Sequence, residues 1–218
     1  MAENWKRLLP ALNALDAQLS LEEALDEAAQ GDGDVKGYCF TAETIGVLEG
    51  KTLDVSGCRF ERCVFSELDF SRLSFVDCVF EKCELSNMRL NSAAFQRVEF
   101  VNCRMTGMEI MRGALMSVLF SGCMMDYLSL SECKLDRVVF EDCRLRESLW
   151  GDVKMPRTRL LRCDTSRSQW LRTPLAGMDF STCDISGWNI TLFDLRGVKV
   201  TAAQVIELSG LLGVEIVP

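Results

Sequence analysis

The sequence lacks histidine altogether, and it contains only 4 Pro and 2 Tyr among its 218 residues. The missing imidazole excludes every catalytic triad, dyad or zinc-protease motif that depends on that side chain. The scarcity of proline and the ordinary glycine content exclude collagen-like and low-complexity chains, while 48% hydrophobic residues are enough to bury a core. The chain is therefore expected to fold, and to work without imidazole chemistry.

Long hydrophobic runs are absent as well. No stretch approaches the roughly 18 consecutive apolar residues of a membrane-spanning helix. The N-terminal stretch MAENWKRLLPALNALDAQ lacks the basic n-region, compact apolar core and small-residue cleavage site of a signal peptide. These absences predict a cytoplasmic protein that does not bind a membrane.

The net charge of −8 is concentrated near the N-terminus. Residues 1–50 contain 10 Asp and Glu against 3 Lys and Arg, a balance of −7, whereas residues 51–218 contain 22 against 21, a balance of −1. A nucleic-acid-binding domain is expected to carry a basic excess, and neither part of the chain does. Direct binding of nucleic acid is therefore not predicted.

Residues whose numbers are divisible by five are hydrophobic from Val55 to Val200, with Thr165 as the single exception. Ten of the twelve Phe residues fall on this grid, and the residues two places before it are mostly small or apolar. A period of five fits neither an α-helix nor an alternating strand. It fits a chain that places two side chains inward on a very short strand, turns a corner and repeats.

A longer period of twenty sets the number of sides. Steps of twenty from Phe60 lead through Phe residues as far as Phe140, and steps of twenty from Cys63 to Cys183 meet a cysteine each time. Because neighbouring coils of a β-solenoid lie about 4.8 Å apart, like side chains twenty residues apart would stack on one another. We therefore predict an all-β solenoid with four sides.

Several repeat segments resemble those of the pentapeptide repeat family, namely CRFER, CVFSE, LDFSR, CVFEK, CELSN and MDFST. The resemblance covers residues 53–200 and implies a right-handed quadrilateral β-helix, with the repeat domain at 38–200. The frequent Cys, Val, Met or Leu two places before the grid resembles the looser repeats of the quinolone-resistance branch. For some members the family role is to present a DNA-like rod to DNA gyrase and to protect it from quinolones.

Helices are predicted before the first coil. The apolar spacing of residues 5–19, interrupted at Pro10, predicts one helix, and the capping box Ser20–Glu23 predicts a second. Together they form an N-terminal helical cap, residues 1–37, with binding of a partner as the alternative role. Residues 38–52 are expected to be an imperfect first coil, in which Phe40 and Ile45 keep the register and Gly50 loses it.

A short helix is also predicted after the last coil. Thr201–Gln204 forms another capping box, and Val205, Leu208 and Leu212 form the apolar stripe of the helix, with a short strand at 214–217. Several family members join tail to tail through such a helix. The resemblance therefore implies a homodimer through residues 201–218 with these three apolar residues in the interface, and a monomeric lid is the alternative.

Ten of the eleven cysteines occupy the same inward position of their repeats. Parallel side chains about 4.8 Å apart keep their Cβ atoms farther apart than the roughly 3.5–4.5 Å of a disulfide, and they do not converge tetrahedrally on a metal ion. The sequence therefore predicts buried free thiols that pack as small hydrophobic side chains, and no metal site.

Four arginines end four successive repeats, which places one at each corner of a single coil: Arg157, Arg162, Arg167 and Arg172. Such a cationic girdle is suited to an acidic protein partner. Steps of twenty back from the last three lead to Asp142, Glu147 and Asp152. Charge ladders between coils are therefore the alternative interpretation.

A second candidate surface consists of outward apolar side chains: Met111, Met116, Leu119, Met124 and Tyr127 near the middle of the rod, and Val79, Val101, Val139 and Leu161 on the same side as Leu119, which is the side of the Phe column. A contiguous apolar patch marks an interaction site, whereas scattered apolar side chains are ordinary on a sheet. Both interpretations stay open at this point.

No Walker loop, GxGxxG turn or carboxylate pair emerges from the repeats, so neither a cofactor nor a catalytic site is predicted. The sequence predicts a non-enzymatic protein that binds a protein partner, and the family resemblance suggests DNA gyrase. Because the repeat region is nearly neutral rather than acidic, a scaffold or adaptor without DNA mimicry is the alternative.

Overall fold

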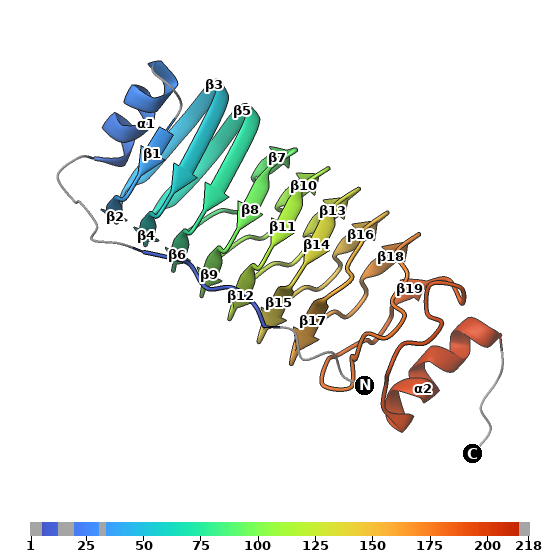
Figure 1. The fold of residues 1–218 in the computed structure, drawn as a ribbon. Coiled ribbons are helices and arrows are strands. Elements are labelled where there is room, and N and C mark those ends of the chain that lie inside the picture. The colour runs from blue at the N-terminus through green and yellow to red at the C-terminus, as the bar shows by residue number, and fades with distance from the viewer. Residues whose placement is uncertain (1–5, 13–19, 31–33, 214–218) are drawn as a thin grey trace.

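A computed structural model describes residues 6–12, 20–30 and 34–213 of the chain. The chain winds into coils of twenty residues that stack in parallel along a rod, with helix α1 (Leu21–Gln30) at one end and helix α2 (Ala202–Leu208) at the other (Figure 1). The predicted four-sided β-solenoid is confirmed. Within the described ranges, no helix is long and apolar enough to cross a membrane.

Three sides of the rod are parallel sheets in which every paired residue lies twenty positions from its partner, as Phe100 does from Phe120. The β9 sheet contains β2 (Cys39–Thr41), β4 (Arg59–Glu61), β6 (Val79–Glu81), β9 (Glu99–Val101), β12 (Leu119–Ser121), β15 (Val138–Glu141) and β17 (Thr158–Leu161). The β10 sheet contains β7 (Arg89–Asn91), β10 (Glu109–Met111), β13 (Ser129–Ser131), β16 (Leu149–Gly151), β18 (Gln169–Leu171) and β19 (Asn189–Ile190). The β8 sheet contains β1 (Asp34–Lys36), β3 (Thr44–Ser56), β5 (Val64–Val76), β8 (Ala94–Gln96), β11 (Ala114–Met116) and β14 (Lys134–Asp136).

The fourth side, which we call the bridge side, is built mainly from single parallel bridges in the described part of the chain. They link Glu84 to Arg104, Arg104 to Met124 and Met124 to Arg144, again at intervals of twenty residues. The coil therefore has four sides of five residues each, as the two sequence periods predict.

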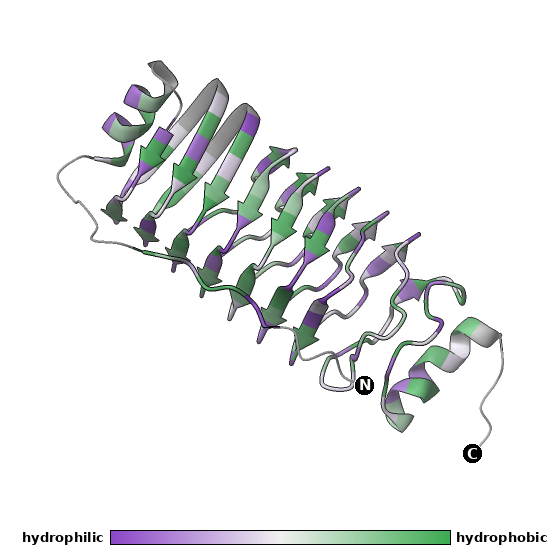
Figure 2. Ribbon diagram, in the orientation of Figure 1, coloured by the Kyte–Doolittle hydropathy of each residue, from purple (hydrophilic) through white to green (hydrophobic). Residues whose placement is uncertain are grey.

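Residues on the five-residue grid fill the interior of the rod. The rings of Phe60, Phe80, Phe100, Phe120 and Phe140 form one stack with centroids 4.6 to 5.0 Å apart, which is the spacing of the coils. Each stacked pair adds about 0.5–1.5 kcal/mol beyond the area that it buries. Figure 2 shows the resulting pattern of hydrophobic strand segments separated by hydrophilic residues.

Thr165, the one polar residue on the grid, is fully buried. Its hydroxyl donates to the carbonyl oxygen of Asp184 at 2.6 Å. A buried hydroxyl with a partner avoids the desolvation cost of an unpaired one, so the exception does not interrupt the column.

The corners between sides use the left-handed backbone conformation. Apart from Gly213, every described residue with positive φ has a number ending in 2 or 7, two places after a grid residue, and the non-glycine values run from 48° at Arg172 to 60° at Asn87. This conformation costs a non-glycine residue roughly 1–2 kcal/mol. Hydrogen bonds between coils offset the cost, as where the Asn102 amide donates to the Ser121 carbonyl at 2.8 Å.

The first coils differ from the later ones. Strands β3 and β5 each continue for 13 residues, and Arg72 lies inside β5 where a later coil would turn (Figure 1). Gly50 pairs with Phe70, so the expected loss of register at Gly50 is wrong, because backbone pairing does not need a side chain. The side chain of Phe70, which the grid places inward, lies outside the described residues.

The N-terminal end is covered by α1, whose capping box is present: Ser20 Oγ accepts from the Glu23 amide at 3.2 Å. The helix predicted before it is wrong for residues 6–12, which run as an extended segment in Figure 1. Pro10 has no backbone N–H to donate within a helix, and the Ala11 N–H donates to the Asp77 carboxylate instead. The rest of that predicted helix, residues 5 and 13–19, lies outside the described residues. Strand β1 falls in the predicted cap segment 1–37 but pairs with β3, so the solenoid begins before residue 38.

The C-terminal end is covered by α2 and a following 3-10 turn, η1 (Ser209–Leu212). The predicted capping box is confirmed: Thr201 Oγ1 accepts from the Gln204 amide, and Gln204 Oε1 accepts from the Thr201 amide. The strand predicted at 214–217 lies outside the described residues.

Candidate protein-interaction surfaces

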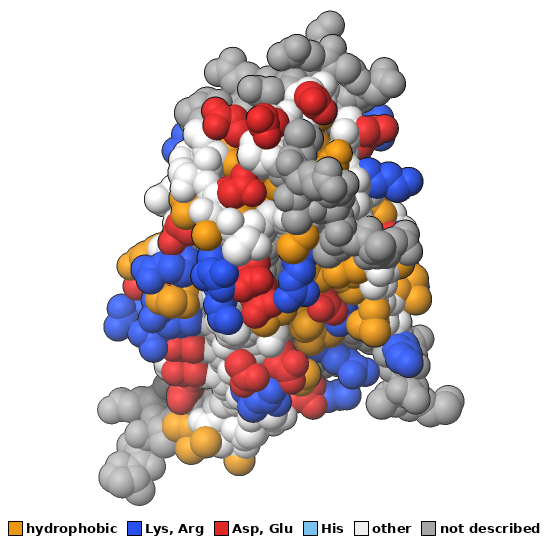
Figure 3. All heavy atoms as spheres, turned by 90° about the vertical axis from the view of Figure 1, so that its left-hand side faces the viewer, with side chains coloured by type: hydrophobic (Ala, Val, Ile, Leu, Met, Phe, Trp, Pro, Cys, Tyr) orange, Lys and Arg blue, Asp and Glu red, His pale blue; other side chains and the backbone are white. Residues whose placement is uncertain are grey.

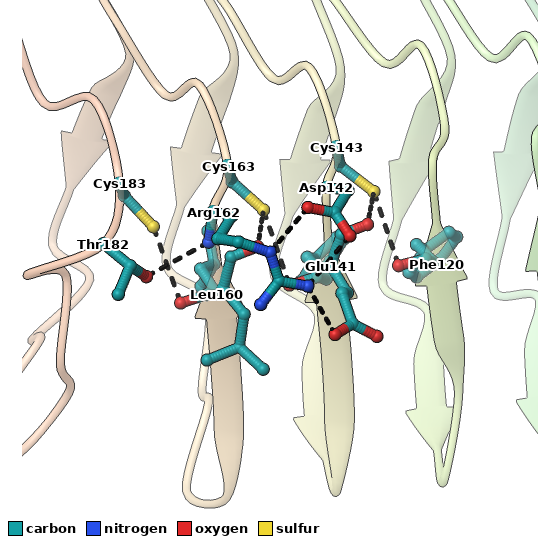
Figure 4. A network of polar contacts seen from close by, with 11 residues as sticks. Phe120, Glu141, Asp142, Cys143, Leu160, Arg162, Cys163, Thr182 and Cys183 are labelled. Atoms are coloured by element: carbon teal, nitrogen blue, oxygen red, sulfur yellow. Dashed lines mark hydrogen bonds and ion pairs between the residues drawn. The ribbon is translucent and has the colours of Figure 1, made fainter.

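The cysteine column lies inside the rod, and all eleven cysteines are free. The thiol of Cys103 lies 3.4 Å from the Phe80 carbonyl oxygen of the preceding coil, and Cys143, Cys163 and Cys183 repeat the contact (Figure 4). Burial raises the pKa of Cys78 to about 12. The Cys78 thiol therefore stays protonated, and burial makes the thiols of the column packing groups and weak donors.

Among the described residues, no group of three Cys, Asp or Glu side chains is arranged to hold a metal ion. Parallel side chains on successive coils do not converge on a point.

The arginine girdle is paired with carboxylates of the preceding coil. Arg162 Nε lies 2.7 Å from Asp142 Oδ1, and its Nη2 lies 2.7 Å from Glu141 Oε1 (Figure 4). Arg172 lies 2.5 Å from Asp152, its predicted partner. Arg167 lies 3.6 Å from Glu147, which is likewise its predicted partner. The predicted charge ladders are therefore present.

Arg157 has a partner that the sequence does not suggest. The residue twenty places before it is Arg137, and both arginines contact the buried Asp136, Arg157 through Nε at 2.7 Å and Arg137 through Nη2 at 3.5 Å. Hydrogen bonds from Arg162 and Arg172 lower the pKa of their Asp partners. Each arginine of the girdle thus has at least one carboxylate partner, and the role of the girdle in binding a partner protein stays a prediction.

The apolar residues predicted near the middle of the rod do not share a surface. Met111 lies on the β10 sheet, Met116 on the β8 sheet and Leu119 on the β9 sheet, while Met124 lies on the bridge side and Tyr127 at a corner. They form a ring around one coil. Because no side carries more than one or two of them, they are separate contact points rather than one patch.

The apolar side chains exposed at the C-terminal end only partly match those that the sequence predicts. Val205 is exposed, Leu208 packs against the core, and the side chain of Leu212 lies outside the described residues. Ile206 is 61% exposed and Phe193 is 76% exposed. Phe193 is the one Phe whose number is not divisible by five. This departure from the inward grid is the signal in the sequence that would have identified it as an exposed residue.

A shallow hollow of about 320 Å³ lies beside this surface. It is lined by Leu192, Phe193, Leu195 and Arg196. Its position in the last coil, close to the C-terminal helix along the chain, makes the end of the rod a candidate site for another protein.

The extended segment 6–12 lies along the β9 sheet (Figure 1). Arg7 Nη2 lies 2.6 Å from Glu99 Oε1, and the two side chains are only 14% and 22% exposed. The Ala11 amide donates to Asp77 Oδ1 at 3.0 Å, and Asp77 also accepts two hydrogen bonds from Arg97 at 2.6 Å each. This contact between the N-terminal segment and the rod is absent from the sequence-based prediction.

Charges of both signs are distributed over the face shown in Figure 3, where acidic, basic and hydrophobic side chains are interspersed. No continuous acidic surface is visible on that face. A rod that imitates DNA needs such a surface, so this face favours binding through mixed contacts.

Comparison with known proteins supports the fold. A family model described as a pentapeptide repeat region matches residues 54–123 and 95–170, which together span more than half of the chain. No curated protein matches the sequence.

Two solved structures of QnrB1, a plasmid-mediated fluoroquinolone resistance protein, are similar to the chain. The trypsin-treated form is 22% identical over 83% of this chain and 99% of that chain, with a TM-score of 0.36. The full-length form is 19% identical over 84% of this chain and 100% of that chain, with a TM-score of 0.30.

A third similar structure is HetL from the cyanobacterium Nostoc, a pentapeptide repeat protein involved in regulating heterocyst differentiation. It is 13% identical over 84% of this chain and 95% of that chain, with a TM-score of 0.27. At these identities the likeness concerns the fold alone. The matched repeats, together with the twenty-residue coils and their corners, lead to one assignment: the chain belongs to the pentapeptide repeat family.

Proposed function

We propose that the chain is a non-catalytic rod of the cytoplasm that binds another protein through its outer surface. The observation that carries the proposal is the filled interior, in which two cavities between the Phe and Leu columns measure only about 10 Å³ each. A small-molecule site typically measures roughly 300–1,000 Å³. Chemistry inside the rod is therefore disfavoured, and the outward side chains of the sheets are what the fold offers to a partner.

DNA gyrase is the first partner to test, because family members of the quinolone-resistance branch act on it. The paired arginines and the mixed face of Figure 3 favour the alternative, a scaffold or adaptor that does not imitate DNA. The two candidates differ in one property, since only the first requires the rod to compete with DNA.

Supercoiling by purified gyrase, with and without a quinolone, distinguishes them. If gyrase is the partner, micromolar protein inhibits supercoiling or relieves poisoning by the drug. The Phe100→Asp variant serves as the control, because an unpaired charge inside the Phe column destroys the rod. If the wild type has neither effect, the gyrase proposal is overturned and the adaptor proposal remains.

We also propose that two rods join at their C-terminal ends. The exposed apolar side chains there, Val205, Ile206 and Phe193, support this, because a monomeric lid has no need for an apolar outer surface.

A further inference from the structure

We infer that the outward face of the β9 sheet is a docking surface for an extended segment of a partner protein, in which a basic residue is followed by apolar residues. We infer also that residues 6–12 of this chain occupy part of that surface as an intramolecular competitor. The inference rests on the proposed protein-binding role and names its surface and its chemistry.

The surface, which we call the β9 face, combines an apolar stripe with acidic residues. The stripe consists of the outward side chains Val79, Val101, Leu119, Val139 and Leu161. Outward carboxylates of the same sheet are Glu61, Glu81, Glu99 and Glu141, and Arg59 and Arg159 also point outward from it. Glu61, Glu81 and Glu141 pair with Arg62, Arg59 and Arg162, whereas Glu99 has its partner in the N-terminal segment. An apolar stripe beside such a carboxylate is complementary to a segment in which a basic residue is followed by apolar residues.

The N-terminal segment has that composition, since it reads Lys-Arg-Leu-Leu-Pro from residue 6. Arg7 supplies the positive charge and pairs with Glu99 at 2.6 Å where both side chains are largely shielded from water. Val79 is only 7% exposed although it points outward, whereas Val139 at the same position three coils later is half-buried. The face is therefore covered at the end where the segment lies.

The segment is held by few contacts. It forms no backbone–backbone hydrogen bond with the described residues, and its anchors are the Arg7–Glu99 pair and the Ala11–Asp77 hydrogen bond. Leu9 is 62% exposed and adds nothing to the core. Ordering each residue of the segment costs conformational entropy, so a segment with two anchors is released easily and can be replaced by another of the same kind.

Trypsin tests the attachment on the full chain, because the peptide bond after Arg7 is a trypsin site. Glu99→Gln should accelerate cleavage after Arg7 at least about fivefold, since cleavage follows the open population. Glu109→Gln removes a comparable charge from the β10 sheet and should leave the rate unchanged. Equal rates for both variants and the wild type would show that Glu99 does not hold the segment.

Binding in trans tests the docking surface. The probe is a fluorescein-labelled peptide with the sequence NWKRLLPAL, residues 4–12, and the readout is fluorescence anisotropy. The full-length Arg7→Glu variant, whose own segment is repelled by Glu99, should bind the peptide at least about tenfold more tightly than the wild type does, because intramolecular competition is lost. Adding Glu99→Arg to that variant restores the internal pair and should weaken peptide binding again, whereas adding Glu109→Arg should not.

Absence of binding to the Arg7→Glu variant, or equal affinity for all four proteins, would overturn the inference. The gyrase assays do not depend on this peptide. Failure of the docking surface is therefore distinguishable from failure of the proposed function.

Discussion

The two ends of the rod are closed in different ways. At the N-terminal end, α1 places Leu21, Ala24, Leu25 and Ala28 in the core, so that one apolar face meets another. At the C-terminal end, the side-chain amide of Gln204 donates to the carbonyl oxygens of Phe180 and Cys183 at 2.9 and 2.7 Å. Among the described side chains of the two helices, only those of α2 include large apolar groups that are exposed.

The difference shows that a solenoid end presents two separate needs. Its apolar columns must be covered, and its unpaired backbone groups must be satisfied so that they do not recruit further strands. The helix α1 mainly covers the apolar columns, and α2 satisfies unpaired backbone carbonyl groups through the side chain of Gln204. Val205 and Ile206 of α2 are thereby left for contacts outside the chain.

The largest effect is expected from Leu25→Asp at the N-terminal end. Leu25 is buried beside Val35 and Leu53, and an unpaired charge there should lower the free energy of unfolding by about 4 kcal/mol. Urea denaturation followed by circular dichroism measures the change. Glu22→Ala, on the exposed side of the same helix, should cost less than about 0.5 kcal/mol. A Leu25→Asp protein as stable as the wild type would mean that α1 does not close the rod.

A smaller loss is expected from Gln204→Ala at the C-terminal end. The variant removes two hydrogen bonds to buried carbonyls and one half of the capping box, which together amount to about 2–3 kcal/mol. Glu207→Ala, on the same helix and exposed, is the matched control. If both variants unfold at the wild-type urea concentration, apolar packing alone closes this end.

A modest pH effect is expected at Asp77, beneath the N-terminal segment. Hydrogen bonds from Arg97 lower the pKa of Asp77 in the folded protein. The stabilisation by the Asp77 carboxylate is therefore complete above the pKa of an unfolded Asp, about 3.9, and is lost as the pH falls through the lower pKa of the folded state. The wild type should therefore lose more stability than Asp77→Asn between pH 5 and pH 2, by about 1 kcal/mol at most. Parallel urea midpoints for the two proteins across this range would contradict the coupling.

The smallest effect on stability, but a change of assembly, is expected from Ile206→Asp. Because Ile206 is 61% exposed in the single chain, the free energy of unfolding of the monomer should change by less than about 0.5 kcal/mol. Light scattering should show a dimer for the wild type and a monomer for the variant. Leu8→Asp places the same charge on an exposed leucine of the N-terminal segment and should leave the dimer intact. A wild type that is monomeric would refute the C-terminal interface.

The repeat itself could be predicted from the sequence because every coil places hydrophobic residues at the same inward positions. The period of twenty gives the register of every sheet, and the stacked cysteines follow from it. The capping boxes were equally readable, since they depend on residues three positions apart. Local spacing therefore determines most of the rod.

The remaining features depend on contacts that spacing does not encode. The helical spacing of residues 6–12 is overridden by Pro10 and by the carboxylate of Asp77 on a distant coil. Arg157 finds Asp136 rather than the residue twenty places back, because that residue is another arginine. The uninterrupted strand β5 has the same grid as the later coils, so the grid does not encode where a strand continues through a corner.

Because every side of the coil has five residues and ends in a corner, the number of residues in the rod determines both its length and the direction in which its end points. Removing twenty residues from its middle would shorten it by about 4.8 Å and leave both ends facing as before. Removing five residues would instead turn everything downstream by one quarter, so that the C-terminal surface would point along a different side from the N-terminal segment. Such a family of deletions could set the angle between two binding partners in steps of about 90°.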